Sequence, residues 1–233
     1  MIVVKDMRIQ VLGEPLVEKV ALVIRPGERV ALVASKAEDA SMVLRVLAGV
    51  EEADRGTVTY EGERTAYAST EMIRAGAGAL GTLHHIRPTF IFFDATHSSD
   101  SDAVTQEIVR FIQGYRGGLL IASSDRRIIE SAKTTRVFEV QSLLQTVTSY
   151  TGTYANFLVE QEKNQARLNE AYEKQQREKR KLEEYLEQKR KEASKKNSSP
   201  EKGAIVRATA RYLEREILNK EIPNPVRADE SPE

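Results

Sequence analysis

Short, uninterrupted apolar runs are the feature that most constrains the fold of this chain. Three of them are Arg29–Ala34, Phe90–Phe93 and Leu119–Ala122. Runs of this length, bounded by turn residues, are typical of strands that are covered on both faces. Segments with the spacing of helices, Ser41–Ala48 and Val104–Gln113, lie between them. Strands that alternate with helices predict an α/β fold with a parallel, layered sheet at its core.

Weaker signals predict the other elements of this core. Alternating residues and turn signals such as Arg25-Pro26-Gly27-Glu28 indicate further strands at Ile2–Val4, Arg8–Val11, Val17–Ile24, Thr57–Glu61 and Val137–Val140. We expect Val137–Val140 to be the last strand. Met72–His85 is expected to keep a helix, which Gly76, Gly78 and Gly81 weaken.

From Tyr154 onward the composition changes. Phe157–Glu192 contains 19 charged residues in 36 positions and neither Gly nor Pro. This predicts one helix of roughly 54 Å, at about 1.5 Å per residue. After a break at Asn197–Pro200, a second helix is expected from Pro200 to about Lys220. Its apolar residues favour an antiparallel hairpin, and the alternative is one solvated helix followed by a disordered tail.

The predicted organisation is an α/β domain over 1–150, a helical hairpin over 151–222 and a flexible tail over 223–233. The chain has no cysteine, which excludes disulfides and thiolate metal sites, and His84, His85 and His97 are too few and too poorly partnered for a metal cluster. No apolar run reaches membrane-spanning length and no signal-peptide pattern is present, so we expect a soluble, cytoplasmic protein. With 35 basic and 35 acidic residues, nucleic-acid binding must rest on local patches, and no DNA partner is expected.

Several segments, taken in order, resemble a nucleotide-binding domain of the ABC ATPases. LVIRPGERVALV and VLRVLAGVEEADRGTVTYEG frame the place of a P-loop, and FIFFDATHSSD stands where these domains have a Walker B strand, with Asp94 retained. GGLLIASSDRRIIESAKTTRVFEV resembles the strand and helix around the switch histidine of the family. Residues 148–195 resemble the inter-domain linker of the ABC-F subfamily, cytosolic ABC proteins that act on the ribosome. The resemblance implies an ABC-type core with a reduced helical subdomain, followed by the linker hairpin.

The P-loop of the family is not retained. Its glycines let backbone N–H groups cradle phosphates, and its lysine neutralises the outer charge. The glycine positions here are Ala34, Ala37 and Asp39, the lysine position is Ala40, and of these motif positions Ser41 matches. Glu38 and Asp39 would face the triphosphate, and like charges about 4 Å apart cost several kcal/mol, out of roughly 8 kcal/mol for micromolar binding.

Other positions that the family uses for ATP are also changed. Ala95 stands at the catalytic glutamate, Ser124 at the switch histidine, Thr70 at the Q-loop and Val11 at the adenine-stacking aromatic. No LSGGQ-like signature is present. These departures predict a pseudo-ATPase with no catalytic residue, cofactor or metal. The alternative is a divergent loop that still binds ATP.

A basic cluster lies around the expected hairpin turn. Six cations outnumber the carboxylates of Glu192 and Glu201: Lys189, Arg190, Lys191, Lys195, Lys196 and Lys202. Such a tip suits RNA phosphates. In ABC-F proteins the linker lies in the ribosomal tRNA exit site, so the resemblance implies a ribosome or rRNA partner. The alternative is a solvated helix end whose lysines complement the helix dipole.

The expected function is therefore that of an ATP-independent, ribosome-associated factor in translation. ABC-F proteins have a second ABC domain after the linker, and this sequence does not continue into one. We therefore do not expect nucleotide-driven closure of two domains within it. The alternatives are an interaction module that pairs with an intact ABC-F protein, and a residual ATP-binding protein.

Overall fold

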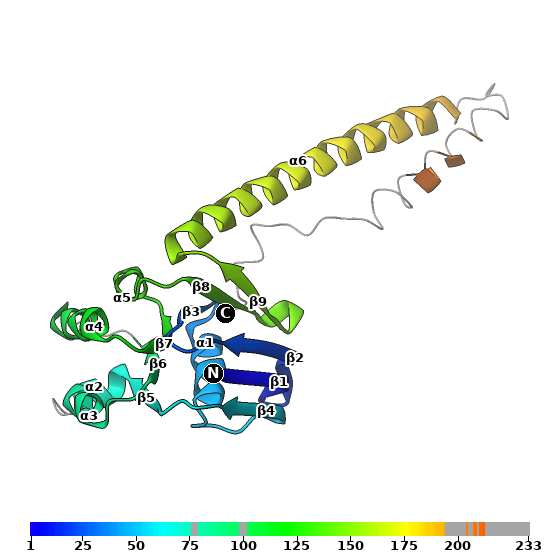
Figure 1. The fold of residues 1–233 in the computed structure, drawn as a ribbon. Coiled ribbons are helices and arrows are strands. Elements are labelled where there is room, and N and C mark those ends of the chain that lie inside the picture. Colours follow the sequence, from blue (N-terminus) through cyan, green and yellow to red (C-terminus); the bar gives the residue numbers. More distant parts are fainter. Residues whose placement is uncertain (76–78, 98–101, 194–203, 205–206, 209, 213–233) are drawn as a thin grey trace. The chain divides into compact units, whose positions relative to one another are not determined.

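The computed structural model of the chain describes residues 1–75, 79–97, 102–193, 204, 207–208 and 210–212 (Figure 1). It divides into two units, Met1–Leu158 and the remainder from Val159 onward. The first unit holds the α/β core. The second unit holds most of one long helix.

A six-stranded sheet organises the first unit. Its strands lie in the order β5-β6-β7-β3-β8-β9. Their bounds are Thr65–Ser69 for β5, Phe90–Ala95 for β6, Gly118–Ser123 for β7, Arg29–Ala34 for β3, Arg136–Gln141 for β8 and Thr146–Thr151 for β9. Neighbours from β5 to β8 are parallel, and β9 is antiparallel to β8. The three apolar runs form the inner strands β6, β7 and β3, as predicted.

Alternate residues of the inner strands pack on opposite faces of this sheet. On β6, Phe90 and Phe92 belong to one apolar cluster, and Ile91 and Phe93 belong to another. Helix α1 (Ala37–Leu47) covers the first face. The second face is covered by α2 (Thr70–Ala75), α3 (Ala79–Ile86), α4 (Asp102–Gly114) and α5 (Arg126–Ser131) (Figure 1). Burial on both faces explains why these strands are apolar along their whole length.

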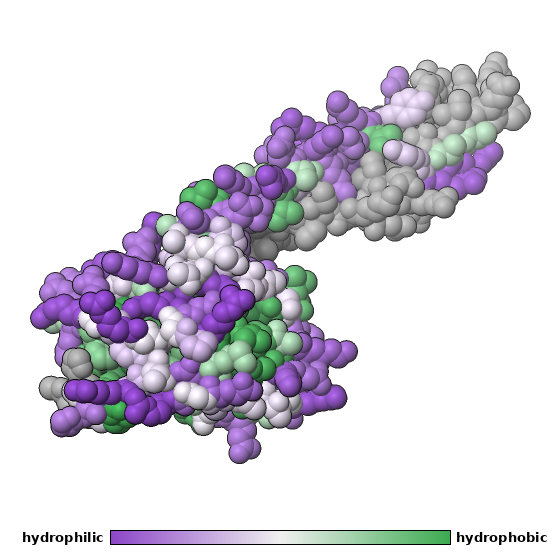
Figure 2. Space-filling view, viewed as in Figure 1, coloured by the Kyte–Doolittle hydropathy of each residue, from purple (hydrophilic) through white to green (hydrophobic). Residues whose placement is uncertain are grey.

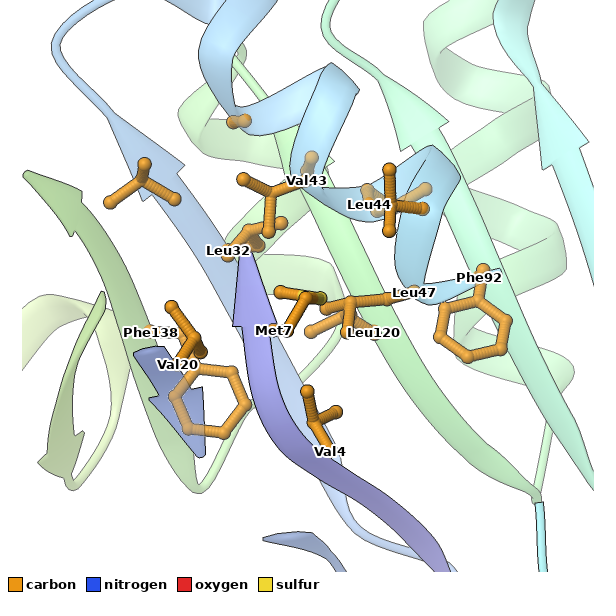
Figure 3. Close-up of a cluster of buried hydrophobic side chains, with 14 of the residues drawn as sticks. Val4, Met7, Val20, Leu32, Val43, Leu44, Leu47, Phe92, Leu120 and Phe138 are labelled. Carbon is orange, nitrogen blue, oxygen red and sulfur yellow. The ribbon is translucent and has the colours of Figure 1, made fainter. Parts of the chain in front are cut away.

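A second sheet lies over α1 and closes the first layer of the core. It is antiparallel, in the order β2 (Glu14–Ile24), β1 (Ile2–Val11) and β4 (Arg55–Tyr60). Figure 3 shows how its apolar side chains meet those of α1 and the large sheet. The labelled members are Val4, Met7, Val20, Leu32, Val43, Leu44, Leu47, Phe92, Leu120 and Phe138.

Strand β1 joins two segments that the sequence predicts as separate strands. The join is an irregularity between Val4 and Met7, with Asp6 at φ 48°. Gly56 of β4 lies opposite this irregularity at φ 92°. A Cβ atom on Gly56 would come within 2.6 Å of the Lys5 carbonyl oxygen. The close approach of the two backbones therefore requires glycine at this position.

The structure corrects the predicted elements in several places. Val137–Val140 is not in the last strand, because β9 follows it and makes the sheet mixed rather than parallel. Both β9 and β5 are partly exposed edge strands. They contain Thr, Ser and Ala and therefore form no apolar run in the sequence. The helix expected over Met72–His85 is divided into α2 and α3, with 76–78 outside the described residues. Helix α1 begins at Ala37, four residues before the predicted start.

The predicted long helix is confirmed as α6, over Tyr154–Ala193. Near its start, Phe157 is buried and packs edge-on against Tyr150, with ring centroids 5.7 Å apart. Farther along, hydrophilic side chains cover most of α6 (Figure 2). Of the predicted second helix, residues 204, 207–208 and 210–212 are described and are helical, and the tail 223–233 lies outside the described residues. The hairpin therefore stays a prediction. None of the described helices is long and apolar enough to span a membrane.

Candidate functional site

The connection from β3 to α1, where the resemblance places a P-loop, is short. Ser35 and Lys36 link the end of β3 to the first residue of α1. Ala37 and Asp39, two of the expected glycine positions, therefore lie inside the helix. Lys36 is the N-cap residue, and its side chain makes no capping hydrogen bond. The first turn of an α-helix has N–H groups without partners inside the helix, and these are groups that can bind a phosphate.

That first turn carries its own negative charge. Glu38 is exposed, while the Asp39 carboxylate accepts a hydrogen bond from the Ser142 hydroxyl. Ser142 begins the short 3-10 helix η1 (Ser142–Leu144), which follows β8. Carboxylates at a helix N-terminus interact favourably with the helix dipole. The first turn of α1 thus already carries two carboxylates, whose charge opposes a bound phosphate.

Ser41 and Asp94 are the two positions at which the sequence matches the motifs of the resembled family, and their side chains contact each other. The Ser41 Oγ donates a hydrogen bond to the Asp94 Oδ2 over 2.5 Å, and both side chains are buried. The Tyr67 hydroxyl donates to the same oxygen over 3.4 Å. The backbone N–H and the hydroxyl of Thr96 donate to Oδ1, over 3.1 and 2.6 Å. Both carboxylate oxygens of Asp94 therefore have protein donors.

Tyr67 is affected by this arrangement. Burial raises the pKa of Tyr67 to about 12, and the negative charge of Asp94 adds to the effect. The phenol therefore stays protonated and remains a hydrogen-bond donor to Asp94 at physiological pH.

The other expected site positions have structural contacts. Ala95 is fully buried in the apolar cluster on the α4 side of the sheet. The hydroxyl of Ser124 donates to the Thr96 carbonyl over 3.3 Å, and the buried Thr70 hydroxyl donates to the Asp94 carbonyl over 3.4 Å. Val11 ends β1 in the small sheet. Ala95 and Val11 have no reactive group, and the hydroxyls of Ser124 and Thr70 are weak nucleophiles unless a base activates them.

Two cavities flank the Ser41–Asp94 pair. One, of about 260 Å³, is lined by Ser35, Ala37, Ala40, Ser123 and Ser124, among others. Its lining contains no Lys, Arg or His among the residues that the structure describes. The other, of about 240 Å³, includes Arg45, and this guanidinium is paired with Glu51 over 2.5 Å. The described residues also contain no group of three or more His, Asp or Glu side chains placed to hold a metal ion.

The predicted RNA-contact residues lie at the end of α6 and beyond it. Lys191 pairs with Glu187 one helical turn away, over 2.7 Å. Lys189 and Arg190 belong to α6, but the structure describes only their backbone. Lys195, Lys196 and Lys202 lie outside the described residues. The RNA-contact hypothesis therefore stays a prediction.

Three hydrogen-bond partners at this site, Thr96, Tyr67 and Ser142, are missing from the sequence-based predictions. Thr96 could have been found, because a residue two positions after an aspartate often donates its N–H to that carboxylate. Tyr67 belongs to β5, an edge strand that the apolar pattern does not reveal. Ser142 is 103 residues away from Asp39, and no local signal links the two.

Comparisons with known proteins locate the similarity of this chain. Residues 143–204 match a family model described as "ABC transporter". No curated protein matches the chain. Among solved structures, an ATP-binding subunit of an ABC transporter matches at 14% identity and a TM-score of 0.46, covering 65% of this chain and 90% of that one. CbiO1 from Clostridium perfringens, part of the ABC transporter complex CbiONQ, matches at 12% identity and a TM-score of 0.48, covering 72% of this chain and 94% of that one.

Proposed function

We propose that this chain is an ABC-F-like protein that neither binds nor hydrolyses ATP and that acts as an ATP-independent ribosome-associated factor in translation through its helical arm, residues 151–222. The observation that carries the first half is the cavity beside the first turn of α1. Among the residues that the structure describes, its lining contains no Lys, Arg or His, whereas a triphosphate needs cations.

The charges near this cavity also oppose a nucleotide. Glu38 and Asp39 add two carboxylates to the first turn of α1, and Ala40 provides no compensating cation. Repulsion at about 4 Å amounts to roughly 4 kcal/mol at an intermediate dielectric constant, about half of the binding free energy of a micromolar ligand. A Mg²⁺–nucleotide complex would also have to displace the donors that Asp94 now holds. The residues present therefore do not fit Mg²⁺–ATP.

Thermal unfolding with and without Mg²⁺–ATP tests this half of the proposal. A micromolar ligand at millimolar concentration would stabilise the folded state by about 4 kcal/mol and raise the Tm by several degrees. We expect no shift, with an intact ABC ATPase as the positive control. We also expect phosphate release by the wild type to equal that of Ser41→Ala. A rise in Tm, or activity that Ser41→Ala removes, would overturn the proposal.

The ribosomal half is supported by the arm. The family match over 143–204 covers β9 and α6, the same segment that resembles the ABC-F linker. The described part of α6 is largely polar and charged, as expected of a helix that contacts a charged partner. The basic residues predicted to lie around the hairpin turn would supply the phosphate contacts.

Sedimentation of a cell lysate through sucrose gradients at low and moderate salt tests this half. We expect the full chain in the ribosomal fractions. Gln in place of Lys189, Arg190, Lys191, Lys195, Lys196 and Lys202 should move it to the top of the gradient. The matched control removes the same charge from the first part of α6, at Lys163, Arg167, Lys174, Arg177, Lys179 and Lys181, and should weaken sedimentation less. Absence of the wild type from every ribosomal fraction would reject the role.

A second candidate is pairing with a protein partner, such as an intact ABC-F protein. It is favoured by two exposed leucines of η1, Leu143 at 88% and Leu144 at 72% exposure, next to the Ser142–Asp39 hydrogen bond. Exposed apolar groups of this size are common in protein interfaces. A salt-resistant protein complex that is free of rRNA and is lost in Leu143→Ser would favour this candidate over the ribosome.

A further inference from the structure

A separate cavity of about 310 Å³ lies at the end of the large sheet where β6 and β7 begin, away from Asp94. Its walls come from the loop before β6, the end of α4 and the turn before β7. Pro88 precedes β6 and Gly117 precedes β7, whereas Asp94 lies near the carboxyl end of β6. Strands of this length place the two sites about 20 Å apart. The cavity, called here the arginine pocket, is thus distinct from the site described above.

Three arginines, Arg87, Arg110 and Arg116, line the arginine pocket, and its lining contains no carboxylate among the described residues. All three are exposed. Within the part of the chain that the structure describes, their guanidinium groups make no hydrogen bond or ion pair. Three cations that share one small cavity repel one another, so an anion bound there would relieve that repulsion as well as pair with them.

The backbone around the pocket is fixed by hydrogen bonds. The Tyr115 hydroxyl donates to the Pro88 carbonyl over 2.9 Å. The buried face of the turn is held by Arg29, which donates to the carbonyls of Tyr115 and Ile112 over 2.8 and 2.9 Å. A Cβ atom on Gly117 would come within 2.6 Å of the Thr89 carbonyl oxygen, so the turn is closely packed. The arginines therefore extend from a rigid frame, which lowers the entropy lost on binding.

Two aromatic rings complete the lining. Phe111 and Tyr115 are stacked, with centroids 6.0 Å apart and an interplanar angle of 11°. Both are partly buried and both line the pocket. Arginines beside aromatic rings are the combination by which proteins bind single-stranded nucleic acids.

We propose that the arginine pocket binds a phosphate group of an RNA strand. Guanidinium groups bind phosphate oxygens in pairs, and three of them can share the oxygens of one phosphate or of two neighbouring ones. An acidic peptide would satisfy the charges but would make no use of the aromatic rings. The proposal does not depend on the arm, because every residue of the pocket lies within Met1–Leu158.

Fluorescence anisotropy of a labelled single-stranded RNA 12-mer, titrated with the full chain, tests the proposal. The triple variant Arg87→Gln, Arg110→Gln and Arg116→Gln should bind on the order of 10-fold more weakly. Its plot of log K against log salt should become shallower by about 0.7 to 1.4, at about 0.7 for each of the one or two phosphates that the pocket contacts. The control variant Lys5→Gln, Arg25→Gln and Lys133→Gln removes three exposed cations outside the pocket and should change the affinity less than about 2-fold. Both variants should unfold at the wild-type temperature, because all six side chains are exposed.

The outcomes separate the possible ligands. Unlabelled RNA should displace the probe, and AMP should displace it at far higher concentration, which identifies a strand rather than a free nucleotide as the ligand. Equal weakening in the two triple variants, no binding by the wild type, or equal competition by a Glu-rich 12-mer would each overturn the proposal. The six-residue arm variant described above should still show pocket-dependent binding. Pocket-dependent RNA binding by the wild type, combined with absence of the wild type from every ribosomal fraction, would reject the ribosomal role and leave this inference intact.

Discussion

At the scale of single residues, Asp94 is the centre of a structural hydrogen-bond network. Asp94 accepts hydrogen bonds from Ser41, Tyr67 and Thr96 and is 4% exposed. These side chains come from four places along the chain: α1, β5, the end of β6 and the residue after it. A buried carboxylate with this many donors ties the elements together, because removing it would leave buried hydroxyls without an acceptor.

Asp94→Ala should lower the free energy of unfolding by on the order of 3 kcal/mol, since it leaves the buried Ser41 and Thr96 hydroxyls unpaired and opens a small cavity. Urea denaturation at pH 7 measures the effect. The control, Glu107→Ala, removes an exposed carboxylate on α4 and should stay within about 0.5 kcal/mol of the wild type. If Asp94 were instead a ligand in an empty metal site with other carboxylates, Asp94→Ala would raise the free energy of unfolding, because it would remove repulsion between like charges. An Asp94→Ala protein as stable as the wild type would contradict the structural role.

Stability should fall in alkaline solution because of Tyr67. Its pKa is raised to about 12 by burial and by Asp94, while an unfolded tyrosine titrates near 10. The stabilisation is complete below about pH 10 and is lost as the pH rises toward 12, because the unfolded state releases its proton first. Urea unfolding between pH 9 and 11.5 measures the slope. Tyr67→Phe should flatten it, as should Tyr115→Phe, whose pKa is also raised to about 12. Identical slopes in all three proteins would contradict this origin.

The sequence predicts part of this residue-scale picture. The resemblance places Ser41 and Asp94 in one site, and the structure brings them together. The partners Tyr67 and Ser142 could not be predicted, because each depends on an element that packs against the site from a distant part of the chain. Long-range side-chain contacts of this kind leave no periodic signal.

At the scale of elements, burial decides which strands can be recognised from sequence. The inner strands β3, β6 and β7 are apolar along their length because helices or a second sheet cover both faces. The edge strands β5 and β9 are made of Thr, Ser, Ala, Tyr and Val, and all of these residues except Ala68 are exposed or partly exposed. The bulge in β1 is hidden for another reason: Asp6 takes a left-handed conformation that its side chain tolerates, so the strand continues past it.

The start of α6, up to Leu158, belongs to the α/β unit and packs against its core. Phe157 is 7% exposed and packs with Ala31, Ile129 and Val137. Phe157→Ala should lower the free energy of unfolding by about 3 kcal/mol, through lost burial and the cavity that remains. Val159→Ala, at a half-exposed position two residues later, should cost less than about 1 kcal/mol. Hydrogen exchange of the first two turns of α6 should increase in Phe157→Ala and not in Val159→Ala, and equal exchange would show that another contact holds the helix.

At the scale of the whole molecule, two units have different sources of stability. Met1–Leu158 contains three apolar clusters. The described helix beyond it relies on local pairs such as Arg177–Glu173 and Lys191–Glu187, both exposed and four residues apart. Pairs of this kind contribute only about 0.3–0.5 kcal/mol each.

The two units should therefore melt differently. Ellipticity at 222 nm should decline gradually as α6 frays, well below the cooperative transition of the α/β unit reported by near-ultraviolet ellipticity. Raising the salt to about 1 M should steepen the early decline, because exposed ion pairs are screened. Superimposable melts at both wavelengths would show that the arm is held by a core of its own.

The hydrogen bond between Ser142 and Asp39 has an evolutionary consequence. A phosphate-binding loop could not arise here through Ala40→Lys alone, because the carboxylates of Glu38 and Asp39 would remain in the same turn. Asp39 would have to change first. This change would remove the hydrogen bond that the Asp39 carboxylate accepts from Ser142 and the favourable interaction of the carboxylate with the α1 dipole. This change would therefore lower stability before any bound phosphate could offset the loss. The hydrogen bond between Ser142 and Asp39 is therefore an obstacle to the stepwise evolution of a phosphate site in this turn.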